Sequence, residues 1–113
     1  MRLEYYDKEK LQQDIIEIVS RYLAVSRYRV FFFGSRVTGK GNDRSDVDVG
    51  IIGSEKVPSD YMRRIKDDVE SIPTLYKIDV VDFGDVSESF RSVAMQKVEY
   101  ITNEMYDKKN SSS

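Results

Sequence analysis

Two aspartates one residue apart, Asp46 and Asp48, open the apolar run DVDVGII at residues 46–52. Side chains alternate between the two faces of a strand, so both carboxylates point to the same side, with Cα atoms roughly 6.5 to 7 Å apart. Removing a carboxylate from water is costly, and a hard cation such as Mg²⁺ prefers oxygen ligands. The spacing therefore predicts a pair of metal ligands.

A third carboxylate is available in the later apolar run LYKIDVVDF at residues 75–83. Asp79 lies among apolar neighbours, where a bound metal would offset the cost of burying its charge. Asp82 is its rival, and the two face opposite sides of a strand because they are an odd number of residues apart. Only one of them can join Asp46 and Asp48. A site with two Mg²⁺ ions could then stabilise the attacking and leaving oxygens of a phosphoryl substitution.

A glycine-rich turn precedes the aspartate pair. Gly34 and Ser35 directly follow the run YRVFFF, and Gly39 and Gly41 come next. Such a turn lets backbone N–H groups point at an anion while a hydroxyl adds a further contact, which predicts phosphate binding. The turn is not the GxxxxGK[ST] loop, because Gly41 stands where Ser or Thr is required, and it does not match GxGxxG. Each feature is also common in surface loops, so their order along the chain is the stronger signal.

The elements that must position these residues follow from apolar spacing. Spacings of three and four residues predict an amphipathic helix capped by Asp7, and a second helix that opens at residues 58–60 and ends before Pro73. Asp85, with Glu88 three residues later, resembles a capping box and predicts a third helix. The predicted strands are residues 28–33, 46–52 and 75–83. Residues 98–102 fit either a continued helix or a short last strand, and their β-prone side chains favour the strand.

Interleaved helices and strands predict an α/β (α+β) domain with a mixed β-sheet and helices packed on one face. At 113 residues the chain predicts one domain, over residues 1–106, followed by a flexible polar tail over residues 107–113.

The amino-acid composition limits the kinds of catalytic and metal-binding groups that the chain can use. The chain has neither histidine nor cysteine, which excludes imidazole acid–base catalysis, thiolate nucleophiles and zinc sites built from these residues. Its formal net charge of −2 disfavours direct nucleic-acid binding. No stretch approaches the ~20 apolar residues of a membrane span, and the N-terminus lacks the apolar core of a signal peptide. We therefore expect a cytoplasmic protein that does not bind membranes.

The order Gly-Ser, short spacer, Asp-x-Asp resembles the nucleotidyltransferase superfamily that includes DNA polymerase beta. More closely, GSRVTGKGNDRSDVDVGI is similar to the GSRxxG…SDxDxxI pattern of minimal nucleotidyltransferases (MNT), the MntA-like antitoxins of HEPN/MNT toxin–antitoxin modules. The resemblance implies the polymerase beta-like fold, and it favours Asp79 over Asp82. The implied nucleotide-binding residues are Gly34, Ser35, Arg36 and Ser45. The implied metal ligands and catalytic carboxylates are Asp46, Asp48 and Asp79.

The resemblance also implies a reaction. A chain of this family would use ATP and two Mg²⁺ ions to transfer AMP onto a hydroxyl, most simply a tyrosine of a cognate helical HEPN toxin, and would act as the antitoxin. The alternative is a non-catalytic antitoxin that neutralises its partner by direct binding. An antibiotic-modifying nucleotidyltransferase is disfavoured, because 113 residues leave no room for the further helical domain of those enzymes.

Overall fold

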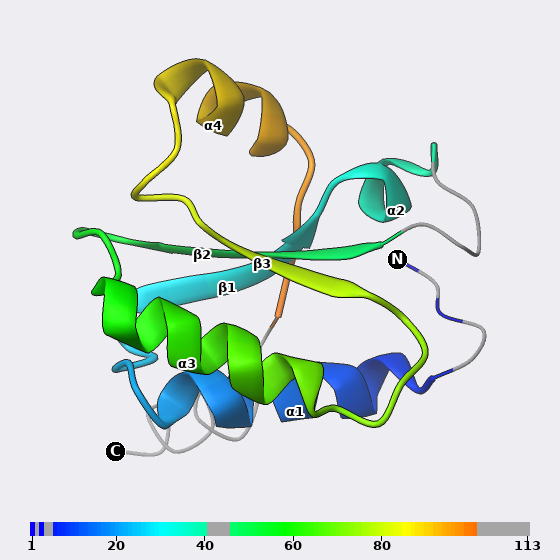
Figure 1. Ribbon diagram of the computed structural model, residues 1–113. Coiled ribbons are helices and arrows are strands. Elements are labelled where there is room, and N and C mark those ends of the chain that lie inside the picture. Colours follow the sequence, from blue (N-terminus) through cyan, green and yellow to red (C-terminus); the bar gives the residue numbers. More distant parts are fainter. Residues whose placement is uncertain (2, 4–5, 41–45, 102–113) are drawn as a thin grey trace, which may run out of the picture.

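The computed structural model describes residues 1, 3, 6–40 and 46–101, and its core is a four-stranded mixed sheet in the order β3-β2-β1-β4 (Figure 1). β1 runs antiparallel to β2 and β4, whereas β2 and β3 are parallel. This architecture confirms the predicted α/β class and mixed sheet. The strands are β1 (Tyr28–Phe33), β2 (Val47–Gly53), β3 (Ile78–Asp82) and β4 (Glu99–Tyr100). The helices are α1 (Lys8–Ser20), α2 (Ser35–Thr38), α3 (Ser59–Glu70) and α4 (Glu88–Ala94).

The two longer helices, α1 and α3, lie together on one face of the sheet, as predicted (Figure 1). Their apolar stripes pack against alternate residues of the strands. The fully buried side chains of this main core include Leu11 and Ile15 of α1, Ile65 of α3, and Val47 and Val49 of β2. Burying one aliphatic side chain of this size contributes about 1.5–3 kcal/mol, so this face fixes which side of β2 looks inward.

The opposite face of the sheet carries an aromatic cluster and is partly covered by the short α4 (Figure 1). Phe31 and Phe33 of β1 both lie edge-on against Phe83, with ring centroids 4.9 Å and 5.0 Å from that of Phe83. Gly50 makes room for this cluster, because a Cβ there would lie 2.4 Å from the Phe31 ring. The prediction of helices on one face is thus confirmed for α1 and α3. Helix α4 lies on the other face, because it packs against the aromatic cluster there.

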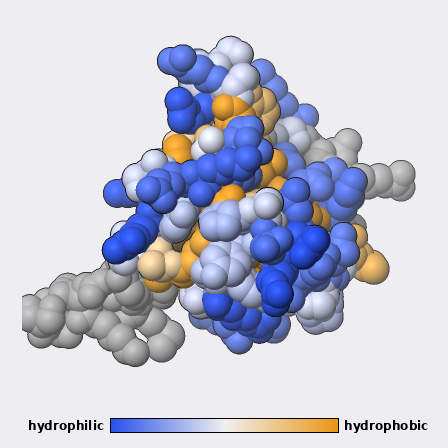
Figure 2. All heavy atoms as spheres, turned by 60° about the vertical axis from the view of Figure 1, so that its left-hand side comes forward, coloured by the Kyte–Doolittle hydropathy of each residue, from blue (hydrophilic) through white to orange (hydrophobic). Residues whose placement is uncertain are grey.

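Most of the face seen in Figure 2 is polar, with hydrophobic side chains visible at the level of α4 and below it in the centre of the view. Two side chains of α4 remain notably exposed, Phe90 at 43% and Val93 at 66%. No residue of α4 is buried, so this helix is held less firmly than α1 or α3.

Of the two N-caps predicted from the sequence, the structure confirms that of α1 and not that of α4. Asp7 is the N-cap of α1, and its carboxylate accepts a hydrogen bond from the Glu9 N–H at 3.0 Å. The predicted cap of α4 is wrong. Ser87 fills that position and accepts a hydrogen bond from the Phe90 N–H at 3.1 Å, because Asp85 belongs to the turn after β3, where its N–H donates to the Asp82 carbonyl at 3.0 Å. The exposed Asp85 carboxylate pairs with Lys56 at 3.1 Å.

Two strands differ in length from their predictions. β3 begins at Ile78 and not at Leu75, because the Leu75 side chain is fully exposed and the preceding residues form a bend. β4 confirms a strand at Glu99–Tyr100, although Thr102 lies outside the described residues. Residues 107–113 also lie outside them, so the tail and the domain boundary stay predictions. Within the described ranges, no helix is both long and apolar enough to cross a membrane.

Candidate active site

The parallel pairing of β2 and β3 brings two of the predicted carboxylates side by side. Asp48 is the direct register partner of Asp79, and neighbouring strands lie about 4.8 Å apart. Val47 and Val49 point into the main core, so Asp48 points to the opposite face. Asp46 stands just before β2, two residues from Asp48, and by the same alternation lies on the same side. The structure therefore brings Asp48 and Asp79 side by side where β2 and β3 begin, with Asp46 just before β2.

The pKa of Asp48 reflects the closeness of the three carboxylates. Burial, and then the negative charges of Asp79 and Asp46, raise the pKa of the Asp48 carboxyl above its ordinary value. Between described residues, none of the three aspartates forms an ion pair with a lysine or arginine. Like charges held together in this way gain most from a cation that they share.

A magnesium ion fits the chemistry of this donor set, since all three side chains offer carboxylate oxygens, the ligands that Mg²⁺ prefers. In the conformation described here, however, no group of three or more acidic side chains among the described residues is close enough to form a complete metal site. The aspartates are thus neighbours with the right chemistry, and they would have to draw together around an ion.

Gly34 is the residue that lets the glycine-rich turn lie against Asp48. It follows the end of β1, where Phe33 pairs with Asp48, and its backbone has φ 84° and ψ −160°. This region of backbone conformation is almost restricted to glycine. A Cβ on Gly34 would lie 2.3 Å from the Asp48 Oδ2 atom. The glycine therefore allows the turn to lie directly against the carboxylate.

The turn itself is the single helical turn α2, which begins at Ser35. Gly39 ends it in the left-handed conformation, with φ 80°. Arg36 is half-buried, and its guanidinium carbon lies 4.7 Å from the centre of the Tyr76 ring. Ser45, the fourth predicted nucleotide-binding residue, lies outside the described residues. The structure thus places Gly34 against Asp48, and α2 directly follows that glycine.

Tyr76 contacts Arg36 through its ring, and no sequence pattern singles it out. The tyrosines carry no motif of their own. The only local signal is its position, three residues before Asp79 in the segment that leads into β3.

Asp82, the rival third carboxylate, faces away from the aspartate group. It is buried on the α3 side, and it accepts hydrogen bonds from the N–H groups of Val57 and Gly84, each at 2.9 Å. Two backbone donors satisfy this carboxylate without a metal. The structure therefore confirms that Asp79 and Asp82 lie on opposite faces, and Asp79 is the one beside Asp48.

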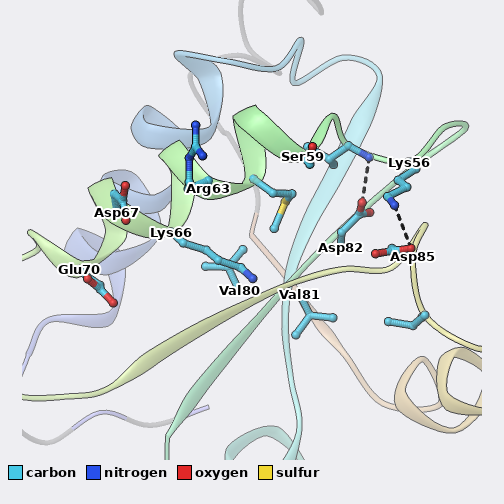
Figure 3. Close-up of a pocket in the computed structure, with 13 residues that line it drawn as sticks. Lys56, Ser59, Arg63, Lys66, Asp67, Glu70, Val80, Val81, Asp82 and Asp85 are labelled. Atoms are coloured by element: carbon cyan, nitrogen blue, oxygen red, sulfur yellow. Dashed lines mark hydrogen bonds and ion pairs between the residues drawn. The ribbon is translucent and has the colours of Figure 1, made fainter.

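A cavity of about 620 Å³ lies between α3 and β3, away from the three aspartates (Figure 3). Lys66 reaches across it toward Val80, and Asp82 and Asp85 stand near its end with Lys56 (Figure 3). None of the three aspartates lines it. We therefore do not assign the nucleotide to this cavity, although its volume would suit a small ligand.

Comparison with known proteins adds independent information. Residues 13–106 match the family described as polymerase beta, nucleotidyltransferase. The probable protein adenylyltransferase MntA of Haemophilus influenzae is 35% identical over 82 residues, which make up 71% of this chain and 69% of that protein.

Two solved structures share the fold. A toxin–antitoxin crystal structure with AMP-PNP superimposes with a TM-score of 0.64 at 16% identity, over 82% of this chain and 75% of that chain. A complex of a tri-AMPylated Shewanella oneidensis HEPN toxin with an MNT antitoxin superimposes with a TM-score of 0.64 at 13% identity, over 91% of this chain and 78% of that chain. The family match, the MntA relative and the Gly34–Asp48–Asp79 arrangement agree, and this chain belongs to the polymerase beta nucleotidyltransferase family.

Proposed function

We propose that this chain is a magnesium-dependent protein adenylyltransferase that transfers AMP from ATP to a tyrosine hydroxyl of a cognate HEPN-type toxin, and that it acts as the antitoxin of the pair. The observation that carries the proposal is the pairing of Asp48 with Asp79, with Gly34 lying against the Asp48 carboxylate. This arrangement sets a phosphate-binding turn beside a group of oxygen ligands, which is what nucleotidyl transfer requires.

The relatives support the choice of reaction and partner. The similar Haemophilus influenzae protein is named a probable protein adenylyltransferase. One structure of the same fold contains the ATP analogue AMP-PNP, and another holds an AMPylated HEPN toxin beside its MNT antitoxin. ATP as substrate and a helical toxin as acceptor are therefore the simplest choices for this chain.

In the proposed reaction, Gly34, Ser35 and Ser45 hold the triphosphate of ATP through backbone and hydroxyl groups. Asp46, Asp48 and Asp79 would hold two Mg²⁺ ions, which supply positive charge to the phosphates when bound. The acceptor oxygen bonds to the α-phosphorus while the bond from that phosphorus to the oxygen that bridges to the β-phosphate breaks.

Pyrophosphate then leaves, and the proton of the acceptor hydroxyl passes to a carboxylate. Asp79 is the residue proposed for this role, since it lies beside Asp48 and faces the same side.

The test uses the purified chain with the helical HEPN-type protein encoded beside it, Mg²⁺, and ATP labelled at the α-phosphate. We expect label on the partner with α-labelled ATP and none with γ-labelled ATP, which separates AMP transfer from phosphorylation. Peptide mass spectrometry should place the added group on a tyrosine.

A double variant, Asp46→Asn with Asp48→Asn, should lose the transfer. Asp60→Asn with Asp67→Asn is the matched control, because these two exposed residues of α3 lose the same two charges on the opposite face of the sheet. Full transfer by the double variant would refute the proposed site. If the double variant lost transfer but still protected cells from the toxin, neutralisation by binding would replace the proposed antitoxin mechanism.

A further inference from the structure

The contact between Arg36 and Tyr76 joins two segments that are forty residues apart. Arg36 lies in α2, two residues after Gly34, and Tyr76 lies just before β3. The guanidinium carbon stands 4.7 Å from the ring centre, well within the ~6 Å range of a cation–π contact. Both side chains are half-buried, so the contact is partly shielded from water.

This contact joins the turn that follows Gly34 to the segment that leads into β3, and Tyr76 also packs against the main core. Tyr76 is followed by Lys77, whose carbonyl oxygen accepts a hydrogen bond from the Val47 N–H at 2.9 Å. Val47 stands between the two aspartates of the pair. The segment that bears the ring is therefore fixed to the strand that bears the metal ligands, while Arg36 is fixed to the turn.

The geometry of a stacked guanidinium suits a further task. Stacking engages the face of the guanidinium plane, whereas phosphate oxygens bind along its edge, often through two parallel hydrogen bonds. The two contacts are therefore compatible. An arginine side chain is also flexible, and a ring that holds its plane in place reduces the conformational entropy lost when it binds an anion.

We propose that Tyr76 is a positioning residue for the nucleotide: its ring orients the Arg36 guanidinium so that Arg36 binds a non-reacting phosphate of ATP. This inference rests on the proposed function and adds to it a residue that acts only through Arg36. Because the interaction is the same in the bound substrate and in the transition state, it lowers KM and leaves kcat unchanged.

The main test is a cycle of variants assayed for AMP transfer to the partner protein. Tyr76→Leu should raise the KM for ATP about two- to fivefold, the effect expected of an exposed or half-buried cation–π contact. The kcat should change by less than about twofold. Tyr76→Phe keeps the ring and should restore the wild-type KM.

The decisive comparison is between Arg36→Ala alone and the double variant that combines Arg36→Ala with Tyr76→Leu. Arg36→Ala alone should raise KM about 10- to 100-fold, as for loss of hydrogen bonds to a charged group. Adding Tyr76→Leu should then change nothing, since the ring acts through the lost guanidinium. Arg36→Lys keeps the charge without the plane and should raise KM to an intermediate value.

Controls separate positioning from folding. Tyr61→Leu is the matched control, because Tyr61 is a 42% exposed tyrosine of α3, a helix that covers the face of the sheet opposite Asp48 and Asp79. Urea unfolding should show that Tyr76→Leu and Arg36→Lys remain folded at the assay temperature. If Tyr76→Leu proves unstable, Arg36→Lys still tests the need for a stacked plane.

Several results would overturn the inference. If Tyr76→Leu raised KM equally with and without Arg36, the ring would contact the nucleotide directly. If it lowered kcat with KM unchanged, or had no effect, Tyr76 would not position Arg36. These outcomes differ from failure of the proposed function, in which the wild-type chain itself would neither bind ATP nor transfer AMP.

Discussion

Gly34→Ala is the substitution that most directly probes the packing of the turn against the carboxylates. The new Cβ would stand 2.3 Å from the Asp48 Oδ2 atom. Restoring ordinary van der Waals contact at 3.4 Å requires a displacement of about 1.1 Å of the carboxylate or the turn. The backbone of residue 34 also lies in a region that costs a non-glycine residue about 1–3 kcal/mol.

Two separate losses are therefore expected. The free energy of unfolding should fall by about 1–3 kcal/mol from backbone strain alone. Misplacing a reacting group by about 1 Å can cost about 100-fold in rate, so kcat/KM for AMP transfer should fall by about that factor.

Gly39→Ala is the matched control for this experiment. Gly39 also has a positive φ, 80°, but among the described residues other than its chain neighbours, no atom would lie within 4 Å of a Cβ there. It should lose about 1–2 kcal/mol of stability and keep most of its activity. Urea unfolding and the label-transfer assay, run on both variants, separate the two effects. Equal transfer rates for Gly34→Ala and Gly39→Ala would refute the argument that the glycine sets the position of Asp48.

Three further outcomes are expected. Asp48→Asn should raise the free energy of unfolding at pH 7, because burial and the neighbouring charges raise the pKa of Asp48 in the folded state and its ionised form therefore opposes folding. This gain in urea unfolding should shrink as the pH falls toward 3.8, and a gain independent of pH would contradict it. Mg²⁺ at about 100 times its Kd should stabilise the wild type by about 2.7 kcal/mol in thermal unfolding and should leave Asp46→Asn/Asp48→Asn unchanged. Asp82→Ala should cost about 1–3 kcal/mol, since the buried Val57 N–H loses its acceptor, yet the folded variant should transfer AMP normally; lost transfer would place Asp82 in the site.

The sequence predicted correctly those helices and strands whose own residues show the full periodic pattern of apolar side chains. The helix capped by Asp7 and the strand through Val47 and Val49 each carry a full buried stripe, so their type and inward face follow from local spacing. The opposite orientation of Asp79 and Asp82 followed from the same alternation. Placing Asp79 beside Asp48 required the family resemblance, because strand order and register depend on the whole sheet.

The remaining features depend on partners far along the chain. Asp85 and Ser87 could each cap α4 by residue type, but the turn after β3 holds Asp85 before the helix, where it pairs with Lys56, 29 residues away. The contact of Arg36 with Tyr76 likewise exists only because β2 and β3 are parallel neighbours. No local pattern encodes such a contact, so it became visible only in the folded chain.

The pairing of Asp48 with Asp79 also determines which insertions and deletions the chain can tolerate. The two carboxylates are matched by a hydrogen-bond register and not by the length of a loop. If the rest of β2 kept its register, deleting one residue within the strand would turn Asp48 toward α1 and α3 and would bring a valine to the face that now carries Asp48 and Asp79. The connections on either side of α3 can change in length while the strands stay paired. We therefore expect related chains to differ most in those connections and least in the lengths of β2 and β3.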